Sequence, residues 1–289
     1  VHWADFGPSD LGNAALLCCN WVGSELIYHP MVVCYDTRPQ VLVLERIDGI
    51  FKDLGRYAAA IWSLYLHFTG GLTLPRLKDV CRRSGMLSPG RARALLIYLQ
   101  LLGYVKPLPK TAPGPRQYVP SPPLITAIKE QARFGLEALT IADPHMRTVL
   151  DHFDEPAFFR TFMMHFGEGA LNASVVVDQG DPFWSIFLMR NAGAQVLQLI
   201  LVSDIDLGGK PIPVSIAALA RQLNVALSHI ARVLRLAEEA KLIQRDSAGA
   251  IILSDTLREQ AGRAFALRIV GYAICGALAY EAVIANPAA

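Results

Sequence analysis

The first half of the chain alternates apolar and polar positions at the spacing of amphipathic helices. An apolar-periodic stretch over 41–68 leads into a second helical pattern at Leu74–Arg83. A short break at 84–87 separates it from a third pattern at 88–102, which ends before Gly103. Because apolar residues recur every three or four positions in each pattern, the sequence predicts three consecutive helices here.

The second half repeats this order of elements. Its apolar stretch covers 183–202, and the two helical patterns that follow cover 215–223 and 226–240. A break at Asn224 and Val225 separates these two patterns, as 84–87 does in the first half. The second half therefore predicts the same succession of helices.

Each half continues through a turn-rich stretch into another helix, and these two exit helices share a local pattern. It reads Ile-Lys-Glu-Gln-Ala at 128–132 and Leu-Arg-Glu-Gln-Ala at 257–261. Similar positions in similar layouts indicate an internal duplication. The sequence therefore divides into an N-terminal segment over 1–40 with a short helix near 11–21, a first repeat over 41–142, a linker or small subdomain over 143–182, and a second repeat over 183–289.

The linker segment is irregular in pattern, and its spacing favours one helix from about Glu155 to His165. Aromatic and methionine side chains cluster there. They are Phe158, Phe159, Phe162, Met163, Met164 and Phe166. Such a cluster either lines a pocket for a small-molecule effector or forms ordinary core packing, and both interpretations stay open at this point.

The second repeat places two short helices around a tight turn with a shared apolar face. The residues of this face are Ile216, Leu219, Leu223, Ile230, Val233, Leu234 and Ala237. This is the pattern of a helix-turn-helix, whose second helix enters the major groove of DNA. Two β-prone runs around a turn at 246–249 predict a hairpin over 243–253, the wing of a winged helix. The expected fold class is mainly α with small β-wings: two winged helix-turn-helix domains in tandem, in a pseudo-twofold arrangement.

The stretch 212–260 resembles the winged-helix domain of the MarR family of bacterial transcription regulators. The matching positions are Leu219 and Ala220 in the first helix, Val225 in the turn, Arg232 in the second helix, Leu242 and Ile243 behind it, and Arg245 at the start of the wing. The resemblance implies a bacterial DNA-binding regulator with Arg232 in the recognition helix. Two winged-helix units in one chain depart from the usual layout of that family.

Three positions depart from the pattern of the family. Asn224 stands where glycine is usual in the turn, and asparagine tolerates the left-handed backbone conformation. Ala226 replaces the usual serine at the N-cap of the recognition helix and cannot make a side-chain capping bond. Lys241 replaces the glycine that usually follows this helix.

The first repeat has a stronger helix start and a longer wing. Ser88 followed by Pro89 predicts a capped helix, with Arg91 and Arg93 in its first turn. The proline-rich loop 107–115 predicts an extended wing in place of a tight hairpin. Lys110 and Arg116 lie near the ends of this loop.

Positive charge gathers in the two repeats although the whole chain carries only +2. The segment 72–118 holds nine Lys or Arg residues and the single acid Asp79, a net charge of +8. The segment 207–253 holds six Lys or Arg residues and three acids, a net charge of +3, so the rest of the chain carries −9. Local positive charge is the pattern of a protein that binds the phosphate backbone.

The sequence holds none of the motifs that carry catalysis or bind a cofactor. G-x-S-x-G, H-E-x-x-H and phosphate-loop patterns are all missing, so an enzyme is not expected. The polar residues around 145–168, including His145, His152 and His165, are interpreted as a solvated acidic surface and not as a metal site. The five cysteines form no C-x-x-C pair and are expected to be buried thiols.

The apolar composition does not by itself predict a membrane protein. The longest charge-free stretches, 11–24 and 269–280, are shorter than a membrane-spanning helix needs and are interpreted as buried helices. No Lys or Arg precedes Arg38, so the basic start of a secretory signal is missing. The expected location is the cytoplasm, and no membrane partner is predicted.

These observations predict a sequence-specific regulator that binds double-stranded DNA. The DNA-contacting residues expected in the second repeat are Ser228, His229, Arg232, Arg235 and Arg245, and those in the first repeat are Ser88, Arg91, Arg93, Lys110 and Arg116. A tandem winged-helix interaction scaffold and a plasmid-type replication initiator are alternatives with the same fold. A homodimer through apolar helices is an alternative to a monomer.

Overall fold

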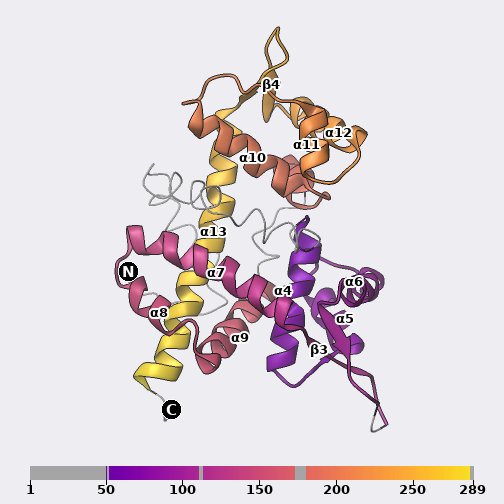
Figure 1. Cartoon of the computed structure of the whole chain (residues 1–289), viewed down its shortest axis with the longest axis vertical. Coiled ribbons are helices and arrows are strands. Elements are labelled where there is room, and N and C mark those ends of the chain that lie inside the picture. Colours follow the sequence, from indigo (N-terminus) through magenta and orange to yellow (C-terminus); the bar gives the residue numbers. More distant parts are fainter. Residues whose placement is uncertain (1–49, 51, 111–112, 173–179, 287–289) are drawn as a thin grey trace. The chain divides into compact units, whose positions relative to one another are not determined.

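The computed structural model describes residues 50, 52–110, 113–172 and 180–286, and these divide into two compact units (Figure 1). Unit 1 comprises the described residues in 55–172 and 266–286, and unit 2 comprises residues 50, 52–54 and 180–265. Both units are mainly helical with small antiparallel sheets, as expected for the fold class. The N-terminal segment 1–40 and its expected helix near 11–21 lie outside the described residues.

Unit 1 begins with helices and a three-stranded sheet. Its elements in chain order are α4 (Leu54–Phe68), β1 (Leu72–Thr73), α5 (Leu74–Arg83), α6 (Pro89–Leu101), β2 (Val105–Pro107), β3 (Gln117–Pro120), α7 (Pro122–Ala142), α8 (Met146–His152) and α9 (Pro156–Asn172). The sheet is antiparallel with strand order β1-β3-β2, and Leu72 pairs with Tyr118 while Val105 pairs with Pro120. The proline-rich loop therefore joins two paired strands, which agrees with an extended hairpin.

Hydroxyl side chains start α5 and α6 where the sequence changes from turn to helix. The Thr73 hydroxyl accepts a hydrogen bond from the Arg76 backbone N–H at 3.4 Å, and the Ser88 hydroxyl accepts one from Arg91 N–H at 3.2 Å. Each cap satisfies one of the backbone donors that a helix start leaves unpaired. The predicted capped start at Ser88 is confirmed.

The segment expected as an irregular linker carries two helices, α8 and α9. The predicted helix near 155–165 lies within α9, which is longer and runs to Asn172. Phe158 and Phe162 are fully buried, and the ring of Phe162 lies edge-on to Phe153 with centroids 5.0 Å apart. Aromatic side chains that pack in this way bury large apolar areas, and their burial makes the segment part of the core of unit 1. The sequence alone left core packing and an effector pocket as alternatives, because local periodicity does not show which side chains of other elements pack against this cluster.

A close contact between α7 and α13 (Asp255–Tyr280) predicts a sensitive position in unit 1. A Cβ atom on Gly135 would lie 2.2 Å from Cδ2 of Tyr272, whose side chain is buried. We expect Gly135→Ala to lower the free energy of unfolding by about 1–3 kcal/mol, because the ring must move in a packed core. Thermal melting followed by circular dichroism measures the change.

The matched control for this substitution is Gly90→Ala in α6. A Cβ at Gly90 meets no atom within 4 Å, so this substitution should leave the melting temperature unchanged or raise it slightly. Tyr272→Leu should partly rescue Gly135→Ala, since it removes the ring that the new methyl group meets. Equal melting temperatures for Gly135→Ala and Gly90→Ala would contradict the close contact.

Unit 2 contains two short helices and a two-stranded sheet behind a longer helix. Its elements are η4 (Trp184–Leu188), α10 (Gly193–Asp206), α11 (Ile216–Gln222), α12 (Leu227–Glu239), β4 (Ile243–Arg245), β5 (Ile251–Leu253) and the first part of α13. The apolar stretch expected over 183–202 is divided between η4 and α10, because the chain turns at Ala192 in the left-handed conformation with φ 57°. The core of unit 2 includes Phe187, Leu201, Leu234 and Leu257.

The C-terminal helix is longer than the charge-free stretch 269–280 that the sequence singled out. α13 continues into η5 (Glu281–Ala285), and Asp255–Ala285 is long and apolar enough to cross a membrane by length and composition. Half of its most apolar window is buried within the protein. Helices in the cores of water-soluble proteins meet the same criterion.

The two cysteines in the described part of the chain are buried thiols, as predicted. Cys81 of α5 and Cys275 of α13 are both free and buried. Burial raises the pKa of the Cys81 thiol to about 12 and raises that of Cys275 as well. Neither thiol is therefore a ready nucleophile, since the thiolate is the reactive form. Cys18, Cys19 and Cys34 lie outside the described residues.

Candidate nucleic-acid interface

A side-chain cap at the start of α11 and a left-handed residue at its end define the turn between α11 and α12. The Ser215 hydroxyl caps α11 by accepting from Ala218 N–H at 3.2 Å. Asn224 takes the left-handed conformation with φ 48°, and the next N–H, that of Val225, donates to the Ala220 carbonyl at 3.0 Å. The left-handed Asn224 predicted for this turn is confirmed, and so is the missing side-chain cap at Ala226.

The end of α12 is a Schellman turn built without glycine. Lys241 has φ 58°. Its backbone N–H donates to the Glu238 carbonyl, and the Leu242 N–H donates to the Ala237 carbonyl, each at 2.9 Å. These two bonds satisfy carbonyls that the end of the helix would leave unpaired. They hold a lysine in a conformation that glycine adopts more easily, at the position where the MarR pattern has glycine.

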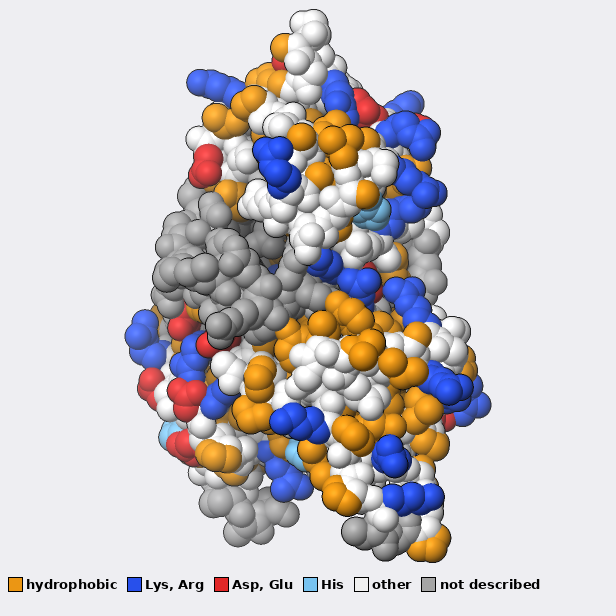
Figure 2. Space-filling view, turned by 45° about the vertical axis from the view of Figure 1, so that its right-hand side comes forward, with side chains coloured by type: hydrophobic (Ala, Val, Ile, Leu, Met, Phe, Trp, Pro, Cys, Tyr) orange, Lys and Arg blue, Asp and Glu red, His pale blue; other side chains and the backbone are white. Residues whose placement is uncertain are grey.

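The two faces of α12 separate apolar from polar residues. Ile230, Val233, Leu234 and Ala237 are buried in the core of unit 2. Ser228, Arg232 and Arg235 are exposed on the opposite face. Figure 2 shows Lys and Arg side chains on the surface around α11 and α12. An exposed polar and cationic face on the second helix of such a pair is what contact with a DNA groove requires.

The two arginines of this face differ in their partners. Arg235 Nη1 donates to Glu239 Oε1 at 3.1 Å, and both side chains are more than half exposed. An exposed pair of this kind contributes little to stability and can be exchanged for a phosphate. Arg232 makes no ion pair or side-chain hydrogen bond with any residue that the structure describes. Its guanidinium is therefore available to an external acceptor.

His229 does not face outward as the sequence predicted. Its Nε2 lies 2.5 Å from the Asn191 carbonyl oxygen, and the side chain is half-buried. Because a carbonyl only accepts, Nε2 must carry the proton in this contact. His229 lies at the border between the two faces of α12, beside the buried Ile230, and its ring contacts the chain at Asn191, next to the turn at Ala192. His229 therefore joins α12 to the segment before α10 in place of pointing into a groove.

Arg245 lies at the end of β4 and is also engaged within unit 2. Its Nε donates to Glu238 Oε1 at 3.0 Å, and each side chain is about one third exposed (31% and 33%). The following turn is closed by Asp246, whose Oδ1 accepts from Ala248 and Ala250 N–H. Arg245 remains near the surface, but a contact with DNA requires it to leave Glu238 or to share its guanidinium.

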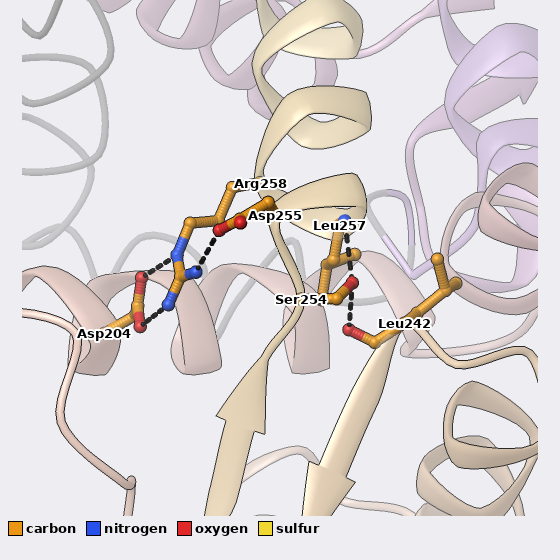
Figure 3. A network of polar contacts seen from close by, with 6 residues as sticks. All are labelled: Asp204, Leu242, Ser254, Asp255, Leu257 and Arg258. Atoms are coloured by element: carbon orange, nitrogen blue, oxygen red, sulfur yellow. Dashed lines mark hydrogen bonds and ion pairs between the residues drawn. The ribbon is translucent and has the colours of Figure 1, made fainter.

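A polar network attaches the hairpin to α13 and α10 (Figure 3). Ser254 donates to the Leu242 carbonyl at 2.9 Å and accepts from Leu257 N–H at 3.1 Å. Arg258 forms a two-pronged pair with the buried Asp204 at 2.9 and 2.8 Å and also donates to Asp255 at 3.0 Å. The hydrogen bonds that Arg258 donates to Asp204 raise the pKa of Arg258. Two parallel hydrogen bonds between an arginine and a carboxylate restrict both the distance and the orientation of the two groups. The network therefore holds the hairpin against α10 and α13.

A lysine far away in sequence supports the turn between the two helices. Lys52 is buried, and its Nζ donates to the Leu223 carbonyl at 3.2 Å, at the C-terminal end of α11. A cation at a helix C-terminus is favoured by the helix dipole. Sequence reasoning placed Lys52 in the first repeat and missed this contact, since nothing local in the sequence indicates a partner so distant.

The predicted DNA-contacting residues of the first repeat are all exposed. These are Ser88, Arg91, Arg93, Lys110 and Arg116. The Ser88 hydroxyl already caps α6, which limits what else it can donate or accept. The outward face of α6 becomes apolar beyond Arg93, with Ala94, Ile97 and Leu101 exposed. The exposed faces of α6 and α12 therefore differ in chemistry, since that of α6 is largely apolar and that of α12 is polar and cationic.

The polar residues around 145–168 form pairs on the surface of unit 1. His152 Nδ1 lies 2.7 Å from Glu155 Oε1. Asp154 contacts Lys129 and Arg133, and their hydrogen bonds lower the pKa of its carboxyl group. Among the described residues, no three His, Cys, Asp or Glu side chains gather closely enough to hold a metal ion.

No protein-family model, curated protein or solved structure matches this chain.

Proposed function

We propose that the chain is a DNA-binding transcription regulator built from two winged helix-turn-helix units in tandem. The observation that carries this proposal is the exposed cationic face of α12, with Ser228, Arg232 and Arg235 on a helix that follows a tight turn and precedes a β-hairpin. Charge of this sign, on an element of this shape, fits a major groove and its phosphates.

The arrangement of strands supports a common origin for the two repeats. In unit 1, β1 directly precedes α5 and pairs with β3, the second strand of the hairpin. In unit 2, Ile212 precedes α11 and pairs with Ile251 in β5, again the second strand of the hairpin. Each repeat thus has two helices and a hairpin whose second strand pairs back to the residues before the first of these helices, through a two-residue strand in unit 1 and a single bridge in unit 2. This order is typical of winged helices, and it supports the proposed duplication.

Base reading falls to Arg232 in this proposal, and phosphate contacts fall to Arg235 and Arg245 of unit 2 and to the exposed Lys110 and Arg116 of the hairpin loop in the first repeat. Arg232 lies at the centre of the exposed face of α12 and has no competing partner among the described residues. An arginine that reaches the edge of a guanine discriminates it from other bases by about 1–3 kcal/mol. The apolar outward face of α6 makes unit 1 a poorer reader of bases.

We expect Arg232→Ala to relax sequence preference and Arg245→Ala to weaken binding to all sequences alike. The target site is first obtained by binding selection from fragmented genomic DNA. Affinities of both variants are then measured at one salt concentration, on the selected duplex and on duplexes with single mismatches. Arg232→Ala should lower the ratio between matched and mismatched affinities about tenfold or more, whereas Arg245→Ala should leave that ratio unchanged.

Lys241→Ala serves as a control, because Lys241 is exposed but lies beyond the end of α12. It should not change the ratio. If Arg232→Ala weakened binding to both duplexes equally, Arg232 would be a phosphate contact and α12 would not be the base reader. Protection of DNA in two patches about 34 Å apart, one helical turn, would support simultaneous contact by both units in a pseudo-twofold arrangement.

A further inference from the structure

The exposed large hydrophobic side chains are concentrated at one place in unit 1. Four of the six such residues in the described part of the chain lie within 97–108: Ile97 (46% exposed), Leu101 (81%), Leu102 (42%) and Leu108 (38%). Figure 2 shows hydrophobic side chains gathered over the α6 region with Lys and Arg side chains around them. A contiguous exposed apolar surface with a polar rim marks an interaction site more often than chance exposure does.

These side chains lie on the outward face of α6. Ala92, Leu95, Leu96 and Leu99 are buried on the inward face. Ala94, Ile97 and Leu101 follow at i, i+3 and i+7 on the opposite side, so they form one line along the helix surface. We call this line, together with Leu102 at the end of the helix, the α6 apolar stripe.

The segment that carries the stripe is strongly basic and holds a single acid. The segment 72–118 carries +8, and its one acid, Asp79, already pairs with Arg82 at 2.5 Å. Arg93 lies one turn before Ile97 on the same face, and Lys106 is exposed on β2. Neither forms an ion pair with any residue that the structure describes. Within the described residues, unit 1 therefore supplies no carboxylate that pairs with these cations.

We propose that the α6 apolar stripe is the docking site for an acidic amphipathic segment of a partner protein. Leu and Ile side chains would take the apolar face of that segment, and Arg93 and Lys106 would pair with its carboxylates. The stripe therefore complements the apolar face of such a segment, and the basic residues beside it complement the acidic face. This inference does not depend on the proposed DNA binding by α12, which lies in unit 2.

Other occupants fit the same surface less well. A second copy of the chain in a symmetric contact would bring the same basic residues face to face. DNA would place phosphates against Ile97 and Leu101, which offer no hydrogen bond. A lipid surface would take the leucines, but Arg93 lies on the outward face itself and would have to follow them toward the hydrocarbon.

The test uses the full chain and a fluorescein-labelled synthetic peptide with Leu along one helical face and Glu on the other. Fluorescence anisotropy should show saturable binding. Leu101→Ser and Arg93→Glu should each weaken it about tenfold or more, as expected for one lost leucine contact or one reversed charge. Leu227→Ser in α12 is the matched control, because Leu227 is also a large exposed hydrophobic residue (55%) and should leave binding unchanged.

Two further peptides separate the contributions of charge and shape. One has the same composition in an order that breaks the apolar face, and the other has Lys in place of every Glu. Both should bind much more weakly than the acidic amphipathic peptide. Equal binding of either, no binding of the acidic peptide, or an equal effect of Leu227→Ser would overturn the proposal.

The other occupants are tested with the same variant. If the wild-type chain were a dimer by light scattering and Leu101→Ser a monomer, the stripe would be a self-interface and the proposal would be wrong. Co-sedimentation with phosphatidylserine vesicles that is lost in Leu101→Ser would assign the stripe to a membrane surface and would also overturn it. Circular dichroism melting of Leu101→Ser should match the wild type, because the side chain is exposed.

Discussion

Raising the salt concentration from 50 to 200 mM should weaken binding of this chain to its selected DNA duplex by about 10²–10³-fold. The segment 207–253 of unit 2 carries six exposed basic residues: Lys210, Arg221, Arg232, Arg235, Lys241 and Arg245. If about five of them neutralise phosphates, the logarithm of affinity falls with the logarithm of salt with a slope of about −4.5. Contacts made by unit 1 would make the slope steeper, because its segment 72–118 carries +8.

The measurement is fluorescence anisotropy on one duplex over a series of salt concentrations. Removing one phosphate contact lowers the magnitude of the slope by about one, so Arg235→Gln should change the slope and Ser228→Ala should not. Arg235 is suited to this test, since its ion pair with the exposed Glu239 is weak and can break when Arg235 contacts a phosphate. A slope near zero would show that phosphates do not drive binding, and the DNA-binding proposal would then fail while the docking proposal for α6 would stand.

Local patterns in the sequence predicted most of the helices, but they did not predict short strands or breaks that depend on tertiary packing. Ser88 and Ser215 start their helices as their side chains predict, and Asn224 takes the left-handed turn. β1 has only two residues, too few to show an alternation of apolar and polar positions, so it was not predicted. The break at Ala192 was missed for a related reason: alanine favours helix, and only tertiary packing places it in the left-handed conformation.

The candidate site was predicted in part. Exposure of Ser228, Arg232 and Arg235 follows from helical periodicity, because the apolar positions of α12 define the opposite face. Periodicity does not reveal partners from other elements, and two of the predicted contacts have such partners. His229 lies against the Asn191 carbonyl, and Arg245 pairs with Glu238. The apolar stripe on α6 was readable in the sequence, but its exposure depends on which face of the helix the rest of unit 1 covers.

The pair between Arg258 and Asp204 should be the most sensitive polar contact in unit 2. We expect Arg258→Met to lower the free energy of unfolding by about 3–5 kcal/mol, because it leaves the Asp204 carboxylate buried without its charged partner. Asp204 is only 6% exposed, whereas Arg258 is about one third exposed (31%). Asp204→Ala should therefore lower the free energy of unfolding by less than Arg258→Met does. The guanidinium that remains is still in contact with solvent and still pairs with Asp255. Chemical denaturation monitored by tryptophan fluorescence measures the change.

The double variant Asp204→Leu with Arg258→Met decides whether the loss comes from an unpaired charge. It removes both charges, so it should recover most of the stability lost in Arg258→Met. Asp255→Ala is the matched control: its carboxylate pairs with the same arginine but is fully exposed, and we expect no measurable change in stability. Because the same arginine holds α13 against α10, Arg258→Met should also weaken DNA binding near its melting temperature, while the double variant should bind normally. A double variant as unstable as Arg258→Met would show that packing, and not the unpaired carboxylate, accounts for the loss.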